Sequence, residues 1–256
     1  MATLEIEQIP VLSDNYVYLI HEPRAGTTAV VDPAVAGPVL ERLEARGWKL
    51  DWILSTHHHA DHTGGNLEVK RATGCKVAGA KADAARIPGI DVQLSEGDRF
   101  RLGELEAEIL ETPGHTSGHI SYWFPEAKAL FCADTLFSLG CGRVSESSFE
   151  QMWHSLSKLA RLPDDAVVWC AHEYTLTNAR FALTIDPENP ALKERAAEVE
   201  RLRSQGKPTV PSGLGAERAA NPFLRAGDPA IRKRLGLESA SDAEVFAEIR
   251  RRKDRF

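Results

Sequence analysis

The most informative segment of this sequence is Thr56-His57-His58-His59-Ala60-Asp61-His62. It holds four of the chain's nine histidines. An apolar run, Trp52-Ile-Leu54, precedes it, and we expect the backbone to turn sharply at Gly64-Gly65, which follow it. Residues two apart on an extended segment point to the same side, which places the side chains of His57 and His59 together. This one stretch can therefore offer several nitrogen and carboxylate ligands to a metal ion.

Two other interpretations of the segment stay open at this point. It could be a surface histidine cluster that binds metal adventitiously. Residues 58–62 also read as the H-x-x-D-H pattern of some metalloproteases, which requires an uninterrupted helix. The predicted strand before the segment and the two glycines after it argue against such a helix.

Three more polar residues follow predicted strands further along the chain. His115 lies in the turn-like stretch Thr112-Pro-Gly-His-Thr-Ser-Gly-His119, and Asp134 and His172 end the apolar runs at 130–133 and 167–171. Sheet proteins commonly place ligands where buried strands emerge. A single such residue is more often structural, but three of them together with the histidine segment favour a metal centre.

The chain changes character near residue 173. Before it we expect strands at 4–11, 15–20, 28–31, 51–55, 75–79, 105–111, 119–124, 128–132 and 167–171, with a helix at 38–46. After it we expect a helix at 191–205, a loop at 206–229, and a final helix that the capping box Ser241-Asp-Ala-Glu244 opens and that ends near Lys253. We therefore predict a catalytic domain at 1–173 and a smaller helical domain at 174–256.

Composition is that of a globular protein, with 256 residues of which 43% are hydrophobic and 27% charged. No apolar run approaches the roughly 20 residues of a membrane-spanning helix, and the opening residues do not resemble a secretory signal. The cysteines form no CxxC pair and are expected to be reduced: Cys75, Cys132, Cys141 and Cys170. We therefore expect a cytoplasmic protein that does not associate with membranes.

Taken together, the motifs resemble the metallo-β-lactamase superfamily. THHHADH is followed in order by PGHTSGH, CADT and AHEY, so that the match spans residues 15 to 175. The resemblance implies an α/β fold, an αββα sandwich with metals at one edge of its two sheets, here followed by a C-terminal all-α domain. Within the superfamily the chain is most similar to the glyoxalase II (hydroxyacylglutathione hydrolase) family. That finer likeness extends over the whole chain and rests on SDNYVYLI, Gly140-Cys-Gly-Arg143, His172-Glu-Tyr-Thr175, Asn221-Pro-Phe-Leu-Arg225 and Arg250-Arg-Arg-Lys-Asp254.

The resemblance implies seven metal ligands and two divalent ions per chain. The first ion would be held by His57, His59 and His115, the second by Asp61, His62 and His172, and Asp134 would bridge the two. Zinc is the first expectation, although imidazole and carboxylate donors also accept iron and manganese. In this scheme His58 points away from the metals, and His119 is packed or supports a ligand.

The implied reaction is hydrolysis of S-(2-hydroxyacyl)glutathione thioesters, such as S-D-lactoylglutathione to D-lactate and glutathione in methylglyoxal detoxification. Two cations would acidify a shared water and polarise the carbonyl, so that a metal-bridging hydroxide attacks without a catalytic side chain or an acyl-enzyme. Cys141 is a poor candidate for a nucleophile because no histidine lies near it in the sequence.

The substrate would be held by cations and hydrogen-bond donors, because glutathione carries two carboxylates. The glutathione-binding positions of the family correspond to Arg143, Tyr174, Arg250 and Lys253. The alternative for the last helix is a solvated basic end favoured by the helix dipole, which we prefer for Arg251, Arg252 and Arg255. Ser145 stands where the family commonly has an aromatic residue in contact with glutathione, so the choice of substrate is where we expect any difference.

Three other functions remain as alternatives. The same two-metal site could serve another thioester or ester, or a single iron could make the chain a persulfide dioxygenase, a class that shares THxHADH. A nucleic-acid-processing enzyme could use the basic end of the chain, where residues 193–256 hold 15 Lys or Arg against 10 Asp or Glu. A net charge of −6 argues against nucleic acid. We favour the two-metal hydrolase acting on a small-molecule glutathione thioester, because Arg250 and Lys253 on the last helix suit glutathione. We also expect a monomer.

Overall fold

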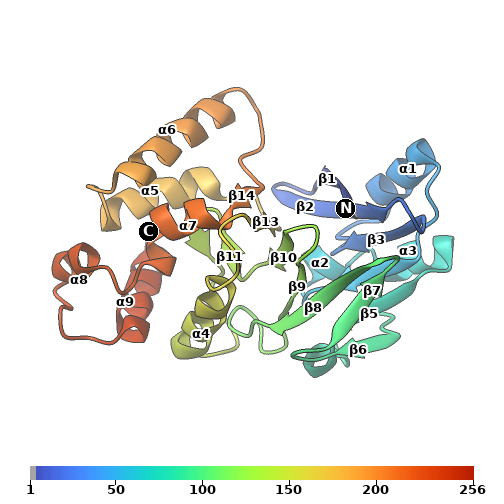
Figure 1. Cartoon of the computed structure of the whole chain (residues 1–256), viewed down its shortest axis with the longest axis horizontal. Helices are drawn as coiled ribbons and strands as arrows, with labels where there is room; N and C mark the ends of the chain where they lie inside the picture. Colours follow the sequence, from blue (N-terminus) through green and yellow to red (C-terminus); the bar gives the residue numbers. More distant parts are fainter. Residues whose placement is uncertain (1–3) are drawn as a thin grey trace. The chain divides into compact units, whose positions relative to one another are not determined.

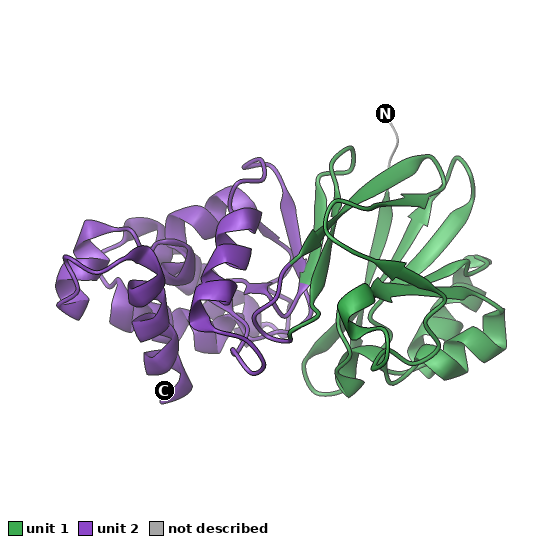
Figure 2. Ribbon diagram, turned by 90° about the horizontal axis from the view of Figure 1, so that it is seen from below, with its two compact units in different colours: residues 1–111, 117–132 green, residues 112–116, 133–256 purple. Residues whose placement is uncertain are grey.

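The computed structural model describes residues 4–256 (Figure 1). Contacts divide them into two compact units, coloured separately in Figure 2: residues 4–111 with 117–132 form unit 1, and residues 112–116 with 133–256 form unit 2. These units do not coincide with the predicted domains, because the loop that carries His115 and the chain from Ala133 onward belong to unit 2. The first three residues of the predicted domain 1–173 lie outside the described residues.

Unit 1 contains two sheets. The first has the strand order β1 (Glu5–Val11), β2 (Asn15–Glu22), β3 (Thr27–Val31), β4 (Trp52–Ser55), β5 (Lys76–Ala80) and β6 (Val92–Leu94). Its first three strands are antiparallel and the rest are parallel from β3 onward. The second sheet includes the antiparallel neighbours β7 (Arg99–Leu102), β8 (Leu105–Glu111), β9 (Ile120–Phe124) and β10 (Ala129–Ala133), the last residue of which belongs to unit 2.

The two sheets share an apolar core. The rings of Trp52 and Phe100 meet edge to face with centroids 5.1 Å apart, and the Tyr122 hydroxyl, fully buried, donates a hydrogen bond to the carbonyl of Ser55 at 3.1 Å. Helix α1 (Gly37–Arg46) buries Val39 and Leu43, and helix α3 (Asn66–Thr73) buries Val69. Such burial is the main stabilising contribution to a layered fold, and it holds the ends of β3 and β4 rigidly.

Unit 2 is mainly helical. Its helices are α4 (Phe149–Leu159), α5 (Thr175–Ile185), α6 (Pro190–Ser204), α7 (Leu214–Ala220), α8 (Pro229–Leu235) and α9 (Asp242–Asp254), with the 3-10 turn η2 (Pro222–Leu224). Two short antiparallel pairs accompany them: β11 (Leu136–Phe137) with β12 (Gly140–Cys141), and β13 (Val167–Cys170) with β14 (Ser212–Gly213). No helix among residues 4–256 is long and apolar enough to cross a membrane.

The strands and helices predicted from the sequence lie within a few residues of the observed ones, and the capping box of α9 is present at Ser241 and Glu244. The prediction of a loop at 206–229 was wrong, because α7 and η2 lie within it. Leu214 and Ala220 of α7 are buried, and tertiary packing overrides the Gly and Pro content of the segment. The resulting fold is α/β with a helical C-terminal part.

Candidate metal centre and substrate cavity

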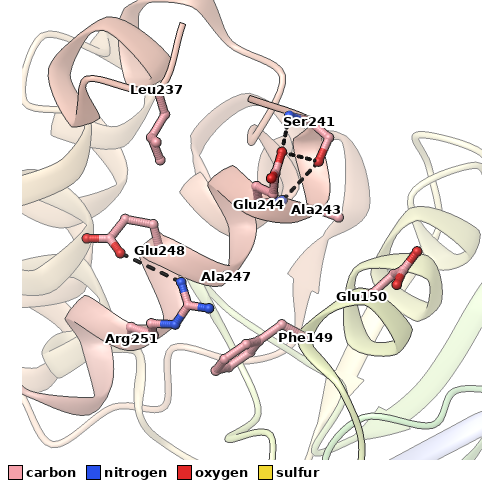
Figure 3. Close-up of a pocket in the computed structure, with 9 residues that line it drawn as sticks. All are labelled: Phe149, Glu150, Leu237, Ser241, Ala243, Glu244, Ala247, Glu248 and Arg251. Carbon is pink, nitrogen blue, oxygen red and sulfur yellow. Dashed lines mark hydrogen bonds and ion pairs between the residues drawn. The ribbon is translucent and has the colours of Figure 1, made fainter. Parts of the chain in front are cut away.

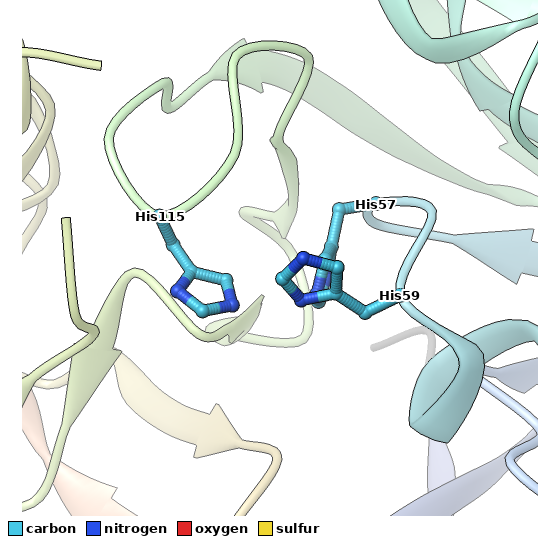
Figure 4. Close-up of side chains that lie close together, drawn as sticks. All are labelled: His57, His59 and His115. Carbon is cyan, nitrogen blue, oxygen red and sulfur yellow. The ribbon is translucent and has the colours of Figure 1, made fainter. Parts of the chain in front are cut away.

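The predicted ligands of unit 1 follow strand β4. His57 and His59 lie on the extended segment after the strand (Figure 4), and Asp61 and His62 lie on the single-turn helix α2 (Ala60–Thr63). The ring centroids of His57 and His59 are 4.8 Å apart, those of His57 and His62 are 4.1 Å apart, and His62 Nε2 lies 3.5 Å from Asp61 Oδ2. Because α2 spans only four residues, the uninterrupted helix of an H-x-x-D-H protease is absent here.

The glycines after this segment act differently from what we expected. Gly64 and Gly65 both have ordinary helical backbone angles, so neither makes a sharp turn that only glycine permits. A Cβ at Gly64 would lie 2.7 Å from the carbonyl oxygen of Ala34, and one at Gly65 would lie 2.6 Å from that of Pro33. The glycines are required because two backbone segments approach closely, which holds α2 against the end of β3.

Asp32, which sequence reasoning missed, organises this half of the site. The residue is buried directly after β3, and its carboxylate accepts hydrogen bonds from the backbone N–H of Thr56 at 2.8 Å and the hydroxyl of Thr56 at 2.7 Å. It also contacts Nδ1 of His62 at 3.1 Å, while Nδ1 of His57 lies 3.0 Å from the Thr56 hydroxyl oxygen. Both rings therefore carry the proton on Nδ1 and keep Nε2 as the donor atom for a metal.

Other polar neighbours fix the remaining side chains of unit 1. The side-chain amide of Asn15 donates to the backbone carbonyl of Asp61 at 3.1 Å and to its Oδ2 at 3.2 Å. His58 Nδ1 lies 2.9 Å from the buried carboxylate of Asp83, and its ring centroid is 4.8 Å from that of His59. His119 is stacked on His57, with centroids 4.8 Å apart.

The predicted ligands of unit 2 come from three separate segments. His115 projects from the loop after β8 (Figure 4), Asp134 follows β10, and His172 follows β13. His115 Nε2 lies 3.3 Å from Asp134 Oδ2, and His172 Nε2 lies 3.3 Å from Asp134 Oδ1, so each carboxylate oxygen faces one imidazole. This arrangement places the carboxylate between two nitrogen donors, as a bridging ligand requires.

The chemistry of these donors fits divalent cations. Nδ1 of His115 lies 2.8 Å from the backbone carbonyl of Arg143, which can only accept, so the ring proton is on Nδ1. The lone pair of its Nε2 then faces an Asp134 oxygen, and two acceptors at 3.3 Å repel unless a cation or proton lies with them. Ligands bound at about 2.0–2.2 Å around a tetrahedral ion are about 3.3–3.6 Å apart, as the paired donors are in each unit.

A close backbone approach holds the loop of Arg143 beside Asp134. A Cβ at Gly142 would collide with the backbone carbonyl oxygen of Asp134, so only glycine is tolerated there. This contact brings the carbonyl of Arg143 to the ring of His115. The motif Gly140-Cys-Gly-Arg143 thus orients a predicted ligand as well as presenting a predicted substrate residue.

Unit 2 also contains a cavity of about 590 Å³ that brings all four predicted substrate residues together. His115 and Asp134 line it, together with Ser145, Phe137, Cys141, Thr177, Asn178 and the predicted Arg143, Tyr174, Arg250 and Lys253. Tyr174 is stacked in parallel on His172, with centroids 4.7 Å apart and 2° between the planes. The cavity therefore joins three cations to two of the predicted metal ligands.

The three cations have different surroundings. The side chain of Arg143 is 74% exposed, whereas Arg250 is only 5% exposed and donates through Nη1 to the carbonyl of Cys141 at 2.9 Å. Burial, followed by the nearby Arg250, lowers the pKa of Lys253 to about 8. Arg250 is therefore not part of a solvated basic helix end, whereas Arg251 and Arg252 pair with Glu248 on more exposed surface.

Cys141 is unsuited to nucleophilic attack. Burial raises the pKa of its thiol to about 11, although the neighbouring Arg250 acts in the opposite direction. At neutral pH the group is a thiol, and the thiolate is the reactive form.

A second cavity, of about 640 Å³, lies between α4 and α9 (Figure 3). It is lined by Glu150, Glu244 and Glu248, with Arg251 over the ring of Phe149 at 5.1 Å. None of the predicted site residues lines it, so the larger cavity lies apart from the metal donors and the cations described above.

Comparisons with known proteins agree with this picture. Residues 12–172 match the family model of the metallo-beta-lactamase superfamily, and residues 173–256 match that of the hydroxyacylglutathione hydrolase C-terminus. The chain is 64% identical to a hydroxyacylglutathione hydrolase of Methylococcus capsulatus over 99% of both chains, and 56% identical to one of Rhodospirillum rubrum over the full length of both.

Solved structures show the same fold. ETHE1 from Myxococcus xanthus superimposes with a TM-score of 0.70 at 24% identity, covering 96% of this chain and 90% of its own. TTHA1623 in a di-iron-bound form gives a TM-score of 0.62 at 22% identity, covering 86% of this chain and 100% of its own. The fold and the His and Asp clusters together indicate a dinuclear metal site in a metal-dependent hydrolase. Because family models match residues 12–256 and full-length relatives are identical at more than half of their positions, the chain belongs to the hydroxyacylglutathione hydrolases of the metallo-beta-lactamase superfamily.

Proposed function

We propose that the chain hydrolyses S-(2-hydroxyacyl)glutathione thioesters, with S-D-lactoylglutathione yielding D-lactate and glutathione in methylglyoxal detoxification. The observation that carries the proposal is the cavity of unit 2, in which predicted metal ligands and three cations line the same space. The names of the full-length relatives and of the matched C-terminal family model support the same substrate class.

The proposed metal centre has seven donors. His57, His59 and His115 would hold one ion, Asp61, His62 and His172 would hold the other, and Asp134 would be a ligand of both. Donor spacings of 3.3–3.5 Å within each unit support this assignment. We favour zinc for both ions, because imidazole and carboxylate donors suit it, while iron and manganese remain accepted by the same set.

The residues of the chain orient the centre and the substrate. When bound, the two ions supply an acidified water and an electrophile for the thioester carbonyl. Asp32 and the carbonyl of Arg143 keep His62 and His115 in the tautomers that coordinate through Nε2. No side chain is required as a nucleophile, and a thiolate leaves readily without a general acid.

The cations of the cavity bind the glutathione part of the substrate. Arg143 and Lys253 face its carboxylates, and Tyr174 provides a hydroxyl and a ring face beside His172. Ser145 also lines the cavity and leaves room where a larger side chain would contact the ligand. Its small size favours a broader range of thioesters than an aromatic residue would allow.

We further propose a monomer in the cytoplasm that binds neither nucleic acid nor membranes. The net charge of −6 and the four buried cysteines, which form no disulfide, support this proposal. Light scattering of the purified protein together with retention on heparin would test it.

The test is steady-state hydrolysis of S-D-lactoylglutathione, compared with the uncharged S-D-lactoyl-N-acetylcysteamine. We expect a kcat/KM above about 10⁴ M⁻¹ s⁻¹ for the glutathione thioester, and a KM about tenfold higher in Lys253→Met. The matched control is Lys193→Met, which removes a cation of α6 that pairs with Glu188. This variant should leave KM unchanged. Oxygen consumption with glutathione persulfide and one iron per chain would instead support the dioxygenase. Equal turnover of both thioesters would favour a general thioesterase.

A further inference from the structure

Asp254 stands where helix chemistry disfavours an acid. It is the last residue of α9, directly after the basic residues 250–253. The negative end of the helix dipole repels a carboxylate there, and the order of Arg250 before Asp254 at i, i+4 is the less favourable one. Interactions within the helix therefore do not explain an acid at this position, and its tertiary contacts have to.

Those contacts lead to the cations of the substrate cavity. Asp254 Oδ1 accepts a hydrogen bond from Nε of Arg250 at 3.1 Å and forms an ion pair with Nη2 of the same guanidinium at 2.9 Å. The same oxygen lies 3.9 Å from Nε of Arg143, which comes from the loop after β12. One carboxylate thus engages cations from two separate segments.

Arg250 depends on this carboxylate. Its guanidinium is buried, donates to the carbonyl of Cys141 and lies 5.2 Å from the centroid of the Phe223 ring. A buried cation without a counter-ion is strongly disfavoured, and Asp254 provides both the charge and two acceptor contacts that fix the guanidinium plane.

Asp254 holds the side chain of Arg143 only weakly. With a side chain 74% exposed and a 3.9 Å ion pair, it gains little stability from Asp254. The attraction still biases the side chain toward the cavity that it lines together with Arg250 and Lys253. Asp254 therefore influences where the cations lie, while not lining the cavity itself.

We propose that Asp254 is a positioning residue for anionic substrates: it fixes Arg250 and restrains Arg143 so that both face the carboxylates of a glutathione thioester. The inference rests on the proposed function and deepens it. Asp254 would act on substrate affinity through other side chains, because it is not among the residues that line the cavity.

The experiment compares Asp254→Asn with the wild type as full-length, metal-loaded protein. Asparagine keeps the size and one acceptor oxygen but removes the charge. We expect the KM for S-D-lactoylglutathione to rise about tenfold with kcat within about twofold, and the kcat/KM for S-D-lactoyl-N-acetylcysteamine to stay unchanged. A merely structural role would lower kcat for both thioesters together, and that result would overturn the proposal.

Two further variants sharpen the test. Glu248→Gln is the matched control, because Glu248 forms an i, i+4 pair with Arg252 at 2.8 Å on the same helix, at the other cavity (Figure 3). It should change neither KM nor kcat. Asp254→Glu keeps the charge and should return KM to within about threefold of wild type; it carries the test if the asparagine variant does not fold.

Calorimetric titration with glutathione separates the two proposals. A wild type that hydrolyses the glutathione thioester, with Asp254→Asn showing unchanged KM and unchanged glutathione affinity, overturns the positioning role alone. A wild type that neither binds glutathione nor hydrolyses its thioester overturns the proposed function and this inference with it.

Discussion

The two units hold their predicted metal donors by different means. In unit 1, four donors come from one short segment, and a single buried carboxylate, that of Asp32, reaches His62 directly and His57 through Thr56. In unit 2, three donors come from separate segments, and backbone approach, a carbonyl and ring stacking hold them. One half therefore depends on a side-chain hub and the other on packing, which predicts different sensitivities to substitution.

The largest effect should come from Asp134, whose carboxylate oxygens face the imidazoles of His115 and His172. In Asp134→Asn the bridging charge is lost, so we expect metal content to fall from two ions to one or fewer per chain. Loss of several kcal/mol of transition-state stabilisation corresponds to a decrease in kcat of roughly 10³-fold. Plasma mass spectrometry and initial rates measure the two effects. Glu188→Gln, an exposed acid of the same unit, should change neither.

Asp32 should come next, because its carboxylate contacts Nδ1 of His62 and the hydroxyl of Thr56 and so orients predicted donors. Asp32→Asn removes the charge that fixes the tautomers of His57 and His62, and such changes typically weaken metal binding by about 10–100-fold. Competition with a chromophoric chelator measures the affinity. Asp98→Asn, which alters an exposed turn of unit 1 where Asp98 accepts from the N–H of Ser95, is the control. Equal metal affinity in Asp32→Asn and wild type would contradict the role of the Asp32 carboxylate in orienting His57 and His62.

Gly142 tests the packing of unit 2. In Gly142→Ala the new methyl would collide with the carbonyl of Asp134, so the free energy of unfolding should fall by about 1–3 kcal/mol. Urea denaturation of the metal-loaded protein measures it. Gly213→Ala is matched, because no atom lies within 4 Å of a Cβ there and its φ of −80° suits alanine. A similar loss in both variants would argue against a specific contact.

The smallest effect concerns pH. The pKa of Lys253 is lowered to about 8, so its positive charge is present below about pH 8 and is lost as the pH rises through that value. The charged or titratable groups that face it are Arg250 and Asp254 of α9 and Cys141 of β12, while α5 offers the carbonyl of Thr177 and the ring of Phe181. The KM for S-D-lactoylglutathione should therefore rise several-fold between pH 7 and 9, as anion binding weakens.

Lys253→Arg separates this charge from other pH effects. Arginine stays charged throughout the range, so the KM of the variant should stay flat between pH 7 and 9. A wild-type KM that does not change with pH, or an arginine variant that follows the wild type, would show that Lys253 does not bind the anion in its charged form.

The sequence predicted most of the strands because apolar alternation and turn residues mark them locally, as at Glu5–Val11. It also predicted the capping box of α9. It did not predict α7, whose Gly and Pro surroundings resemble a loop until Leu214 and Ala220 find their packing partners.

For the site, motif order predicted seven ligands and four substrate residues, but it did not predict the residues that orient them. A single aspartate after a strand, like Asp32, looks the same in sequence whether it caps a turn or orients two histidines. Asp254 is equally inconspicuous among the basic residues at the end of the chain. The roles of these two aspartates become visible only from their contacts in space, with Thr56 for Asp32 and with Arg143 for Asp254.

The most direct test is a titration of the metal-free enzyme with zinc, followed by the initial rate of S-D-lactoylglutathione hydrolysis. If both donor sets hold ions that the reaction requires, the rate rises until about two equivalents per chain and then stays constant. A plateau at one equivalent would contradict the dinuclear centre, and no hydrolysis at any metal content would contradict the proposed substrate.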